Sequence, residues 1–83
     1  MEKYRLVLRK RVAKDLRAIP KLDVKRILAR MDALTADPRP MGCEKLSGQE
    51  RYRVRQGAYR IIYEIVDDRL IVTIVKIGHR RAV

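Results

Sequence analysis

Basic side chains gather in the last third of the chain, at spacings that could hold an anion. Arg53 and Arg55 alternate with apolar residues, Arg60 follows the dipeptide Gly57-Ala58, and a Gly-His-Arg sequence ends at Arg80. The planar guanidinium group of arginine matches the oxygens of a phosphate with two parallel hydrogen bonds. Whether these side chains act together depends on how the strands that carry them pair.

Three runs of β-favouring residues, separated by two short turns, predict a three-stranded antiparallel meander. The runs are Arg51–Gln56, Tyr59–Val66 and Arg69–Ile77, and the turns are Gly57-Ala58 and Asp67-Asp68. Gly and Asp tolerate the positive φ that tight turns require, so each turn is interpreted as a two-residue hairpin loop.

Two-residue loops fix the register of the meander. The first hairpin then pairs Arg55 with Arg60, Arg53 with Ile62 and Arg51 with Glu64, and the second pairs Arg60 with Val75, Ile62 with Thr73 and Glu64 with Ile71. Because side chains alternate between the two faces of a sheet, one face is an apolar core made of Tyr52, Val54, Tyr59, Ile61, Tyr63, Ile65, Leu70, Val72 and Ile74. The other face, called the basic face below, carries Arg51, Arg53, Arg55, Arg60, Ile62, Glu64 and Thr73, and then His79 if the strand continues.

The basic face brings like charges together. Like charges directly opposite each other on a sheet cost up to about 1 kcal/mol, and here Arg55 opposes Arg60 with only Glu64 on that face to offset them. A solvated surface is the ordinary interpretation of exposed arginine. The convergence of four or five arginines on one side of a small sheet favours an anion-binding site.

Length and charge limit the class of protein. The 83 residues predict one small domain, residues 1–83, and the 21 Lys and Arg against 10 Asp and Glu give a net charge of +11. That balance indicates a polyanionic partner, either nucleic acid or a strongly acidic protein.

Cys43 is the only cysteine and His79 the only histidine. A disulfide within the chain is therefore excluded, and we expect the protein to be cytoplasmic. We do not expect a zinc site, because one Cys and one His cannot form it alone. We expect no membrane association, because the sequence has no signal peptide and no apolar run near 18 residues. We expect no cofactor, and the sequence has no Gly-rich phosphate loop.

The first half of the chain predicts a strand and a helical hairpin. The expected elements are a strand at Lys3–Leu8, a helix at Lys10–Ile19 closed by Pro20, a second helix from about Asp23 to Asp37, and a loop at Met41–Gln49 from which Lys45 could reach the basic face. The predicted fold is α+β with the order β-α-α-β-β-β, a small antiparallel sheet whose apolar face packs on the helical hairpin.

The segments KLSG, RYRVRQGAYRIIYEI and IVTIVKIGHRR resemble the RelE-type toxins of the RelE/ParE superfamily of bacterial and archaeal toxin–antitoxin systems. The preceding IPKLDVKRILARMDALTADPRP is similar to the helical hairpin of that family. The resemblance implies an mRNA interferase that enters the ribosomal A site and cuts the message. It also implies a toxin–antitoxin complex with a cognate antitoxin, which we expect to be acidic and partly disordered.

The resemblance also implies roles for individual residues. The positions that match the family's basic residues around the scissile phosphate are Arg53, Arg55, Arg60 and Arg80. We expect Arg55, Arg60 and Arg80 to be catalytic, with His79 because imidazole suits proton transfer near neutral pH. We expect Lys45, Arg51, Arg53 and Arg81 to bind RNA.

The sequence leaves alternatives open. Many family members carry a tyrosine a few residues after the position of Arg80, and this sequence ends at Val83 without one. Either the chain is shortened, or His79 carries more of the chemistry, or the enzyme is weak. The alternatives to the nuclease are a ParE-like poison of DNA gyrase and a weakened module that only binds RNA or its antitoxin.

Overall fold

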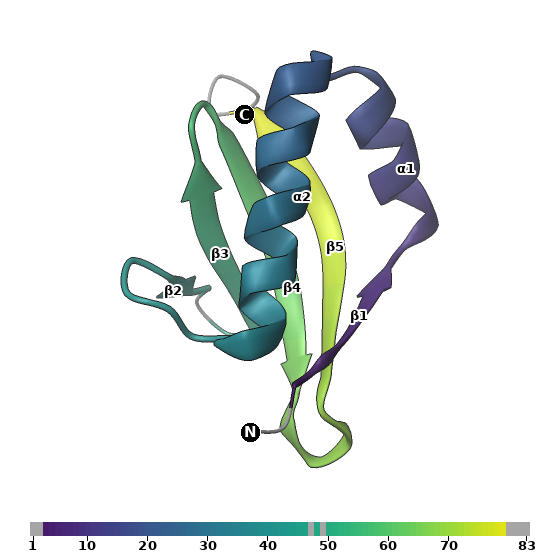
Figure 1. The fold of residues 1–83 in the computed structure, drawn as a ribbon. Coiled ribbons are helices and arrows are strands. Elements are labelled where there is room, and N and C mark those ends of the chain that lie inside the picture. The colour runs from purple at the N-terminus through teal and green to yellow at the C-terminus, as the bar shows by residue number, and fades with distance from the viewer. Residues whose placement is uncertain (1–2, 47, 49, 80–83) are drawn as a thin grey trace.

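Two helices cover one face of a five-stranded sheet in the computed structural model of the protein, which describes residues 3–46, 48 and 50–79 (Figure 1). The elements in chain order are β1 (Arg5–Leu8), α1 (Lys10–Arg17), α2 (Lys21–Ala36), β2 (Glu44–Lys45), β3 (Arg51–Gln56), β4 (Tyr59–Val66), a short 3₁₀ helix η1 (Asp67–Arg69) and β5 (Ile71–His79). The predicted α+β class and the helical hairpin are confirmed. No helix in the described part of the chain is long and apolar enough to cross a membrane.

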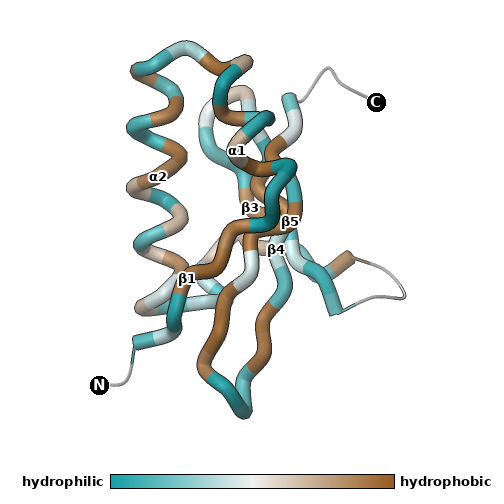
Figure 2. Tube along the Cα trace, turned by 90° about the vertical axis from the view of Figure 1, so that its right-hand side faces the viewer, coloured by the Kyte–Doolittle hydropathy of each residue, from teal (hydrophilic) through white to brown (hydrophobic). Residues whose placement is uncertain are grey.

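The helical hairpin follows from a proline and an apolar stripe. Pro20 precedes α2 as its N-cap residue, and its φ of −55° suits the sharp reversal between the helices. Ile27, Met31 and Leu34 are buried and recur at spacings of four and three residues, so they lie on one side of α2. Figure 2 shows the resulting alternation of hydrophobic and hydrophilic segments along α2, which stands beside the sheet.

The core lies between the helices and the inner face of the sheet. Its buried residues are Val12, Ile27, Met31, Leu34, Tyr52, Val54, Ile61, Tyr63, Val72, Ile74 and Ile77. The sheet contributions to this set alternate along β3 and β4, as predicted. The opposite face of the sheet is left uncovered by helices (Figure 1).

The strand order in the sheet is β1-β5-β4-β3-β2. The edge strand β1 runs parallel to β5, with Arg5 opposite Ile71 and Leu8 opposite Ile74, while the other pairings are antiparallel. The second edge strand, β2, lies inside the segment that the sequence predicted to be a loop. Two residues are too few to produce a recognisable alternation, so this strand could not be predicted from the sequence.

The predicted register is confirmed in one hairpin and wrong in the other. Arg55 faces Arg60, Arg53 faces Ile62 and Arg51 faces Glu64, as expected from the Gly57-Ala58 turn. Between β4 and β5 the chain turns over four residues, and pairing resumes only with Val66 opposite Ile71. The cause is η1 followed by Leu70, whose φ of 54° lies in the left-handed region.

A β-bulge shifts the second hairpin again. Tyr63 pairs with Ile74 but Ile62 pairs with Lys76, so Val75 is an extra residue in β5. The four-residue turn alone places Glu64 opposite Thr73, not Ile71, and the bulge beyond it places Arg60 opposite Gly78, not Val75. Past the bulge, each side chain of β5 points to the face opposite to the one that unbroken pairing would give it.

A polar cluster ties four segments together at the end of the sheet where β4 turns into β5. Arg39 donates to both carboxylate oxygens of Asp67, at 3.2 and 2.9 Å, and Tyr4 donates its hydroxyl to the same carboxylate at 2.7 Å. The Arg39 guanidinium also lies 5.2 Å from the ring centroid of Tyr52. Next to it, the buried Tyr63 hydroxyl donates to the Pro38 carbonyl at 2.7 Å.

We predict that Asp67→Asn lowers stability at neutral pH and that the difference disappears in acid. Hydrogen bonds from Arg39, and then from Tyr4, hold the pKa of Asp67 below its usual value near 3.8. A depressed carboxyl pKa contributes stability that is present above the unfolded-state value and is lost as the pH falls through the folded-state value. Denaturant unfolding should give a constant difference from the parent between pH 7 and about 5, closing below about pH 4. Asp68→Asn, in the same exposed turn, is the control. A stability difference between Asp67→Asn and the parent that does not change with pH would contradict the prediction.

Candidate functional site

The uncovered face of the sheet carries the arginines that the sequence placed there. They stand in two neighbouring rows across the strands, one formed by Arg55, Arg60 and Gly78 and the other by Arg53, Ile62 and Lys76. Arg55 is exposed and Arg53 and Arg60 are half-buried. Because the rows come from paired strands, backbone hydrogen bonds fix the spacing of their side chains.

Two carboxylates pair with the arginines at one side of this face. Glu64 accepts from Arg9 at 2.9 Å and from Arg51 at 3.0 Å, and Glu44 accepts from Arg53 at 2.7 Å. These pairs are partly open to solvent, and exposed pairs are worth only about 0.2–1 kcal/mol. A phosphate group can therefore compete for these arginines at small cost.

Arg53 also keeps an unused donor. Its Nε is buried and has no hydrogen-bond partner among the described residues, although its Nη2 donates to Glu44. A buried donor without a partner costs about 1–3 kcal/mol. An oxygen of a bound anion could satisfy that donor.

Lys45 is not brought onto the basic face. It pairs with Tyr52 across β2 and β3, which places it on the side of the sheet that bears the helices, and its ammonium lies 3.4 Å from Glu50. Its neighbour Glu44 takes the basic face instead, opposite Arg53. The expectation that only Glu64 offsets the arginines was therefore wrong.

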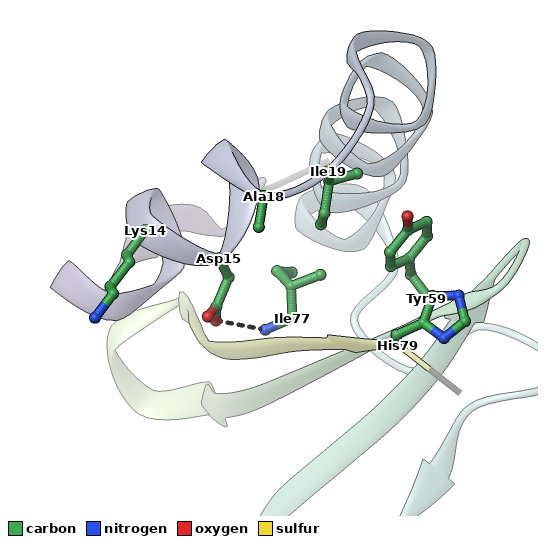
Figure 3. Close-up of a pocket in the computed structure, with 7 residues that line it drawn as sticks. All are labelled: Lys14, Asp15, Ala18, Ile19, Tyr59, Ile77 and His79. Carbon is green, nitrogen blue, oxygen red and sulfur yellow. Dashed lines mark hydrogen bonds between the residues drawn. The ribbon is translucent and has the colours of Figure 1, made fainter. Parts of the chain in front are cut away.

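His79 lies on the other side of the sheet from the arginine rows. The bulge in β5 pairs His79 with Tyr59, and the two rings meet edge to face with centroids 5.2 Å apart. Figure 3 shows His79 beside Tyr59 in a pocket of about 340 Å³ under α1, where Asp15 accepts a hydrogen bond from the Ile77 amide at 3.1 Å. The prediction that His79 continues the basic face was wrong, because it assumed unbroken pairing.

The expected site residues Arg80 and Arg81 lie outside the described residues. The structure adds two basic residues that the sequence analysis did not place on this face, Arg9 and Lys76. Arg9 follows a short edge strand whose partner could not be predicted, and Lys76 reaches the face only through the bulge. No group of three or more His, Cys, Asp or Glu suited to a metal ion occurs in the described part of the chain.

Comparison with known proteins decides the family. Residues 6–83 match the family described as the ParE toxin of the type II toxin–antitoxin system parDE. The chain belongs to the RelE/ParE superfamily of type II toxins. This RelE/ParE toxin is 33% identical over 82 residues to a Methanocaldococcus jannaschii protein named "Putative toxin RelE1", covering 94% of this chain and 91% of that one.

Solved structures agree with this assignment. The toxin superposes on the archaeal RelE–RelB complex from Pyrococcus horikoshii with a TM-score of 0.86 and 32% identity, over 98% of this chain and 99% of the other. It also superposes on the RelBE2 toxin–antitoxin complex of Mycobacterium tuberculosis, with a TM-score of 0.83 over 94% and 99% of the chains. At 22% identity the second likeness bears on the fold alone. The predicted RelE-like fold is confirmed.

Proposed function

We propose that this toxin is a ribosome-dependent mRNA endoribonuclease that inhibits translation. The observation that carries the proposal is the pair of arginines Arg55 and Arg60, held directly opposite each other on the uncovered face with Arg53 in the next row. The repulsion between these arginines destabilises the free protein, and a bound phosphate would relieve that repulsion. Likeness to a RelE–RelB complex at 32% identity supports the same proposal.

The proposed chemistry uses the RNA's own hydroxyl. The 2′-hydroxyl gives up its proton to a base as its oxygen attacks the adjacent phosphorus. The bond to the 5′-oxygen of the next nucleotide breaks, that oxygen takes up a proton, and a 2′,3′-cyclic phosphate remains. Negative charge gathers on the non-bridging oxygens during the attack, and fixed guanidinium groups stabilise that charge without needing to reorganise. A resident metal ion is not needed for this reaction. Arg60 is the best placed donor, because it lies on the central strand β4 between Arg55 on β3 and Gly78 on β5.

A second function has an observation of its own. The family that matches residues 6–83 is described as a ParE toxin, so a poison that acts on DNA gyrase without cutting RNA is the alternative. The two functions are separated by primer extension on translated mRNA after brief induction of the toxin. The nuclease produces cuts within codons, whereas the gyrase poison produces damage in DNA and leaves messages intact.

We predict that Arg60→Ala reduces mRNA cleavage by about 10²- to 10³-fold, the loss expected when one donor to the transition state is removed. The thermal midpoint should change little, because the residue is off the core face. The readout is primer extension in a translation reaction, with toxicity in cells at equal protein level as a second measure. Arg26→Ala, an exposed arginine on α2, is the matched control. Full activity of Arg60→Ala would contradict the proposed site.

We predict that His79→Gln separates a catalytic histidine from a structural one. If His79 transfers a proton during cleavage, the variant should cut about 10²-fold more slowly and lose the parent's dependence of rate on pH. If its role is its contact with Tyr59, the variant should melt earlier but keep the parent's pH profile. The same translation assay, run at several pH values, decides between the two results.

We predict a cognate antitoxin with an acidic, partly disordered segment that covers this toxin. The net charge of +11 and the likeness to the archaeal RelE–RelB complex at 32% identity support it. A partner that binds only the folded toxin at about 1,000 times its Kd adds about 4 kcal/mol, which raises the melting temperature by more than about 10 °C. A glutamate-rich peptide of equal charge controls for bulk electrostatics. Equal melting temperatures with and without the antitoxin would rule the partner out.

A further inference from the structure

One cation of the basic face belongs neither to the expected site nor to the ion pairs that offset it. Lys76 lies directly opposite Ile62, and two residues further on Gly78 lies opposite Arg60. Residues that pair across strands point to the same face, so Lys76 joins Arg53 and Arg60 there. Without the bulge, unbroken pairing from Tyr63 and Ile74 would have set Lys76 opposite Ile61, toward the helices.

The absence of a side chain at Gly78 leaves space for the side chain of Lys76. A Cβ at Gly78 would lie 3.9 Å from the Cε of Lys76, so the lysine side chain extends along β5 over the glycine and into the row of Arg60. Gly78 does not have a positive φ, so the backbone there does not require glycine. A small pocket of about 90 Å³ is lined by Arg60, Ile62, Lys76, Gly78 and His79.

The surroundings of Lys76 favour an anionic ligand. Its side chain is exposed, and among the described residues no carboxylate lies within 4 Å of its ammonium, since Glu64 and Glu44 are paired with arginines. An ordinary solvated lysine would be expected to avoid a row that already holds Arg60 and Arg55. A phosphate oxygen in the small pocket would relieve this repulsion.

We propose that Lys76 is a substrate-binding residue, which contacts the backbone phosphate of single-stranded RNA next to Arg60. This inference rests on the proposed RNA substrate. The ammonium is a compact charge on a flexible stem with three donors, so it can follow the phosphate as its geometry changes while the guanidinium groups stay fixed. The β-bulge then has a function, which is to turn a residue of β5 from the core face to the substrate.

The test measures the salt dependence of binding of the purified toxin to a single-stranded RNA that cannot be cut, with 2′-O-methyl groups throughout. The slope of log K against log salt concentration reports the number of phosphates neutralised, at about 0.7 per phosphate for single strands. Lys76→Ala should bind more weakly, with a slope shallower by about 0.7, and Lys76→Arg should keep the parent slope. Lys25→Ala, an exposed lysine on α2, is the matched control. A parent-like slope for Lys76→Ala would overturn the proposal.

A second variant tests the place of the contact without changing charge. Gly78→Val suits a strand but fills the space over which Lys76 extends, and it should lower affinity about as much as Lys76→Ala. Gly78→Ala adds only a methyl group at ordinary contact distance and should bind as the parent does. Parent-like binding by Gly78→Val would show that Lys76 does not act over Gly78.

The two proposals fail in different ways, because binding is measured without cleavage. If Lys76→Ala shifts the salt slope but the parent makes no cuts in translated mRNA, the RNA contact of Lys76 is supported and the proposed nuclease activity is wrong. If the parent cuts mRNA and Lys76→Ala binds RNA as the parent does, the proposed nuclease activity is supported and the proposed RNA contact of Lys76 is wrong.

Discussion

A single extra residue in β5 sets the arrangement of the whole end of the sheet that carries the candidate site. Tyr63 pairs with Ile74 and Ile62 pairs with Lys76, so Val75 is left between the two pairs without a partner of its own on β4. Beyond it Ile77 turns into the core, where its amide is held by Asp15 of α1, while Lys76 turns to the basic face. A bulge locally disrupts the hydrogen bonds between strands, and bulges are over-represented next to active sites, where they can redirect a side chain. Here it supplies a cation to one face and an apolar anchor to the other.

The charges of the basic face are offset unevenly. Glu64 and Glu44 together hold Arg9, Arg51 and Arg53. Arg55 and Lys76 have no ion pairs with carboxylates among the described residues. The face therefore has a compensated region and a region of excess positive charge. An RNA strand would be drawn first to the second region, and the weak ion pairs of the first can exchange for further phosphates.

The sequence was informative where short-range rules apply. The Gly57-Ala58 turn fixes the register of β3 against β4, so the position of Arg60 opposite Arg55 could be predicted. The next turn contains Leu70 in a left-handed conformation, which leucine rarely adopts and which no propensity would indicate. Just past the bulge, the Ile77 amide donates to Asp15 of α1, a contact between distant segments. For these reasons the directions of His79 and Lys76 could not be derived from alternation alone.

The same sheet separates what holds the fold from what the site can bind. The cluster around Arg39 and Asp67 joins the residue before β1, β3, the segment after α2 and the turn after β4. Arg60 and its partner Gly78 lie near the opposite end of β4. Tyr63 supports the cluster from the core, because its ring stacks on that of Tyr52 with centroids 5.8 Å apart and its hydroxyl donates to the Pro38 carbonyl. Burial raises the pKa of the Tyr63 phenol, so it stays a neutral donor. The arginines of the basic face are not part of this core. The fold can therefore tolerate mutually repelling cations on the basic face, because the apolar face and the Asp67 cluster maintain it.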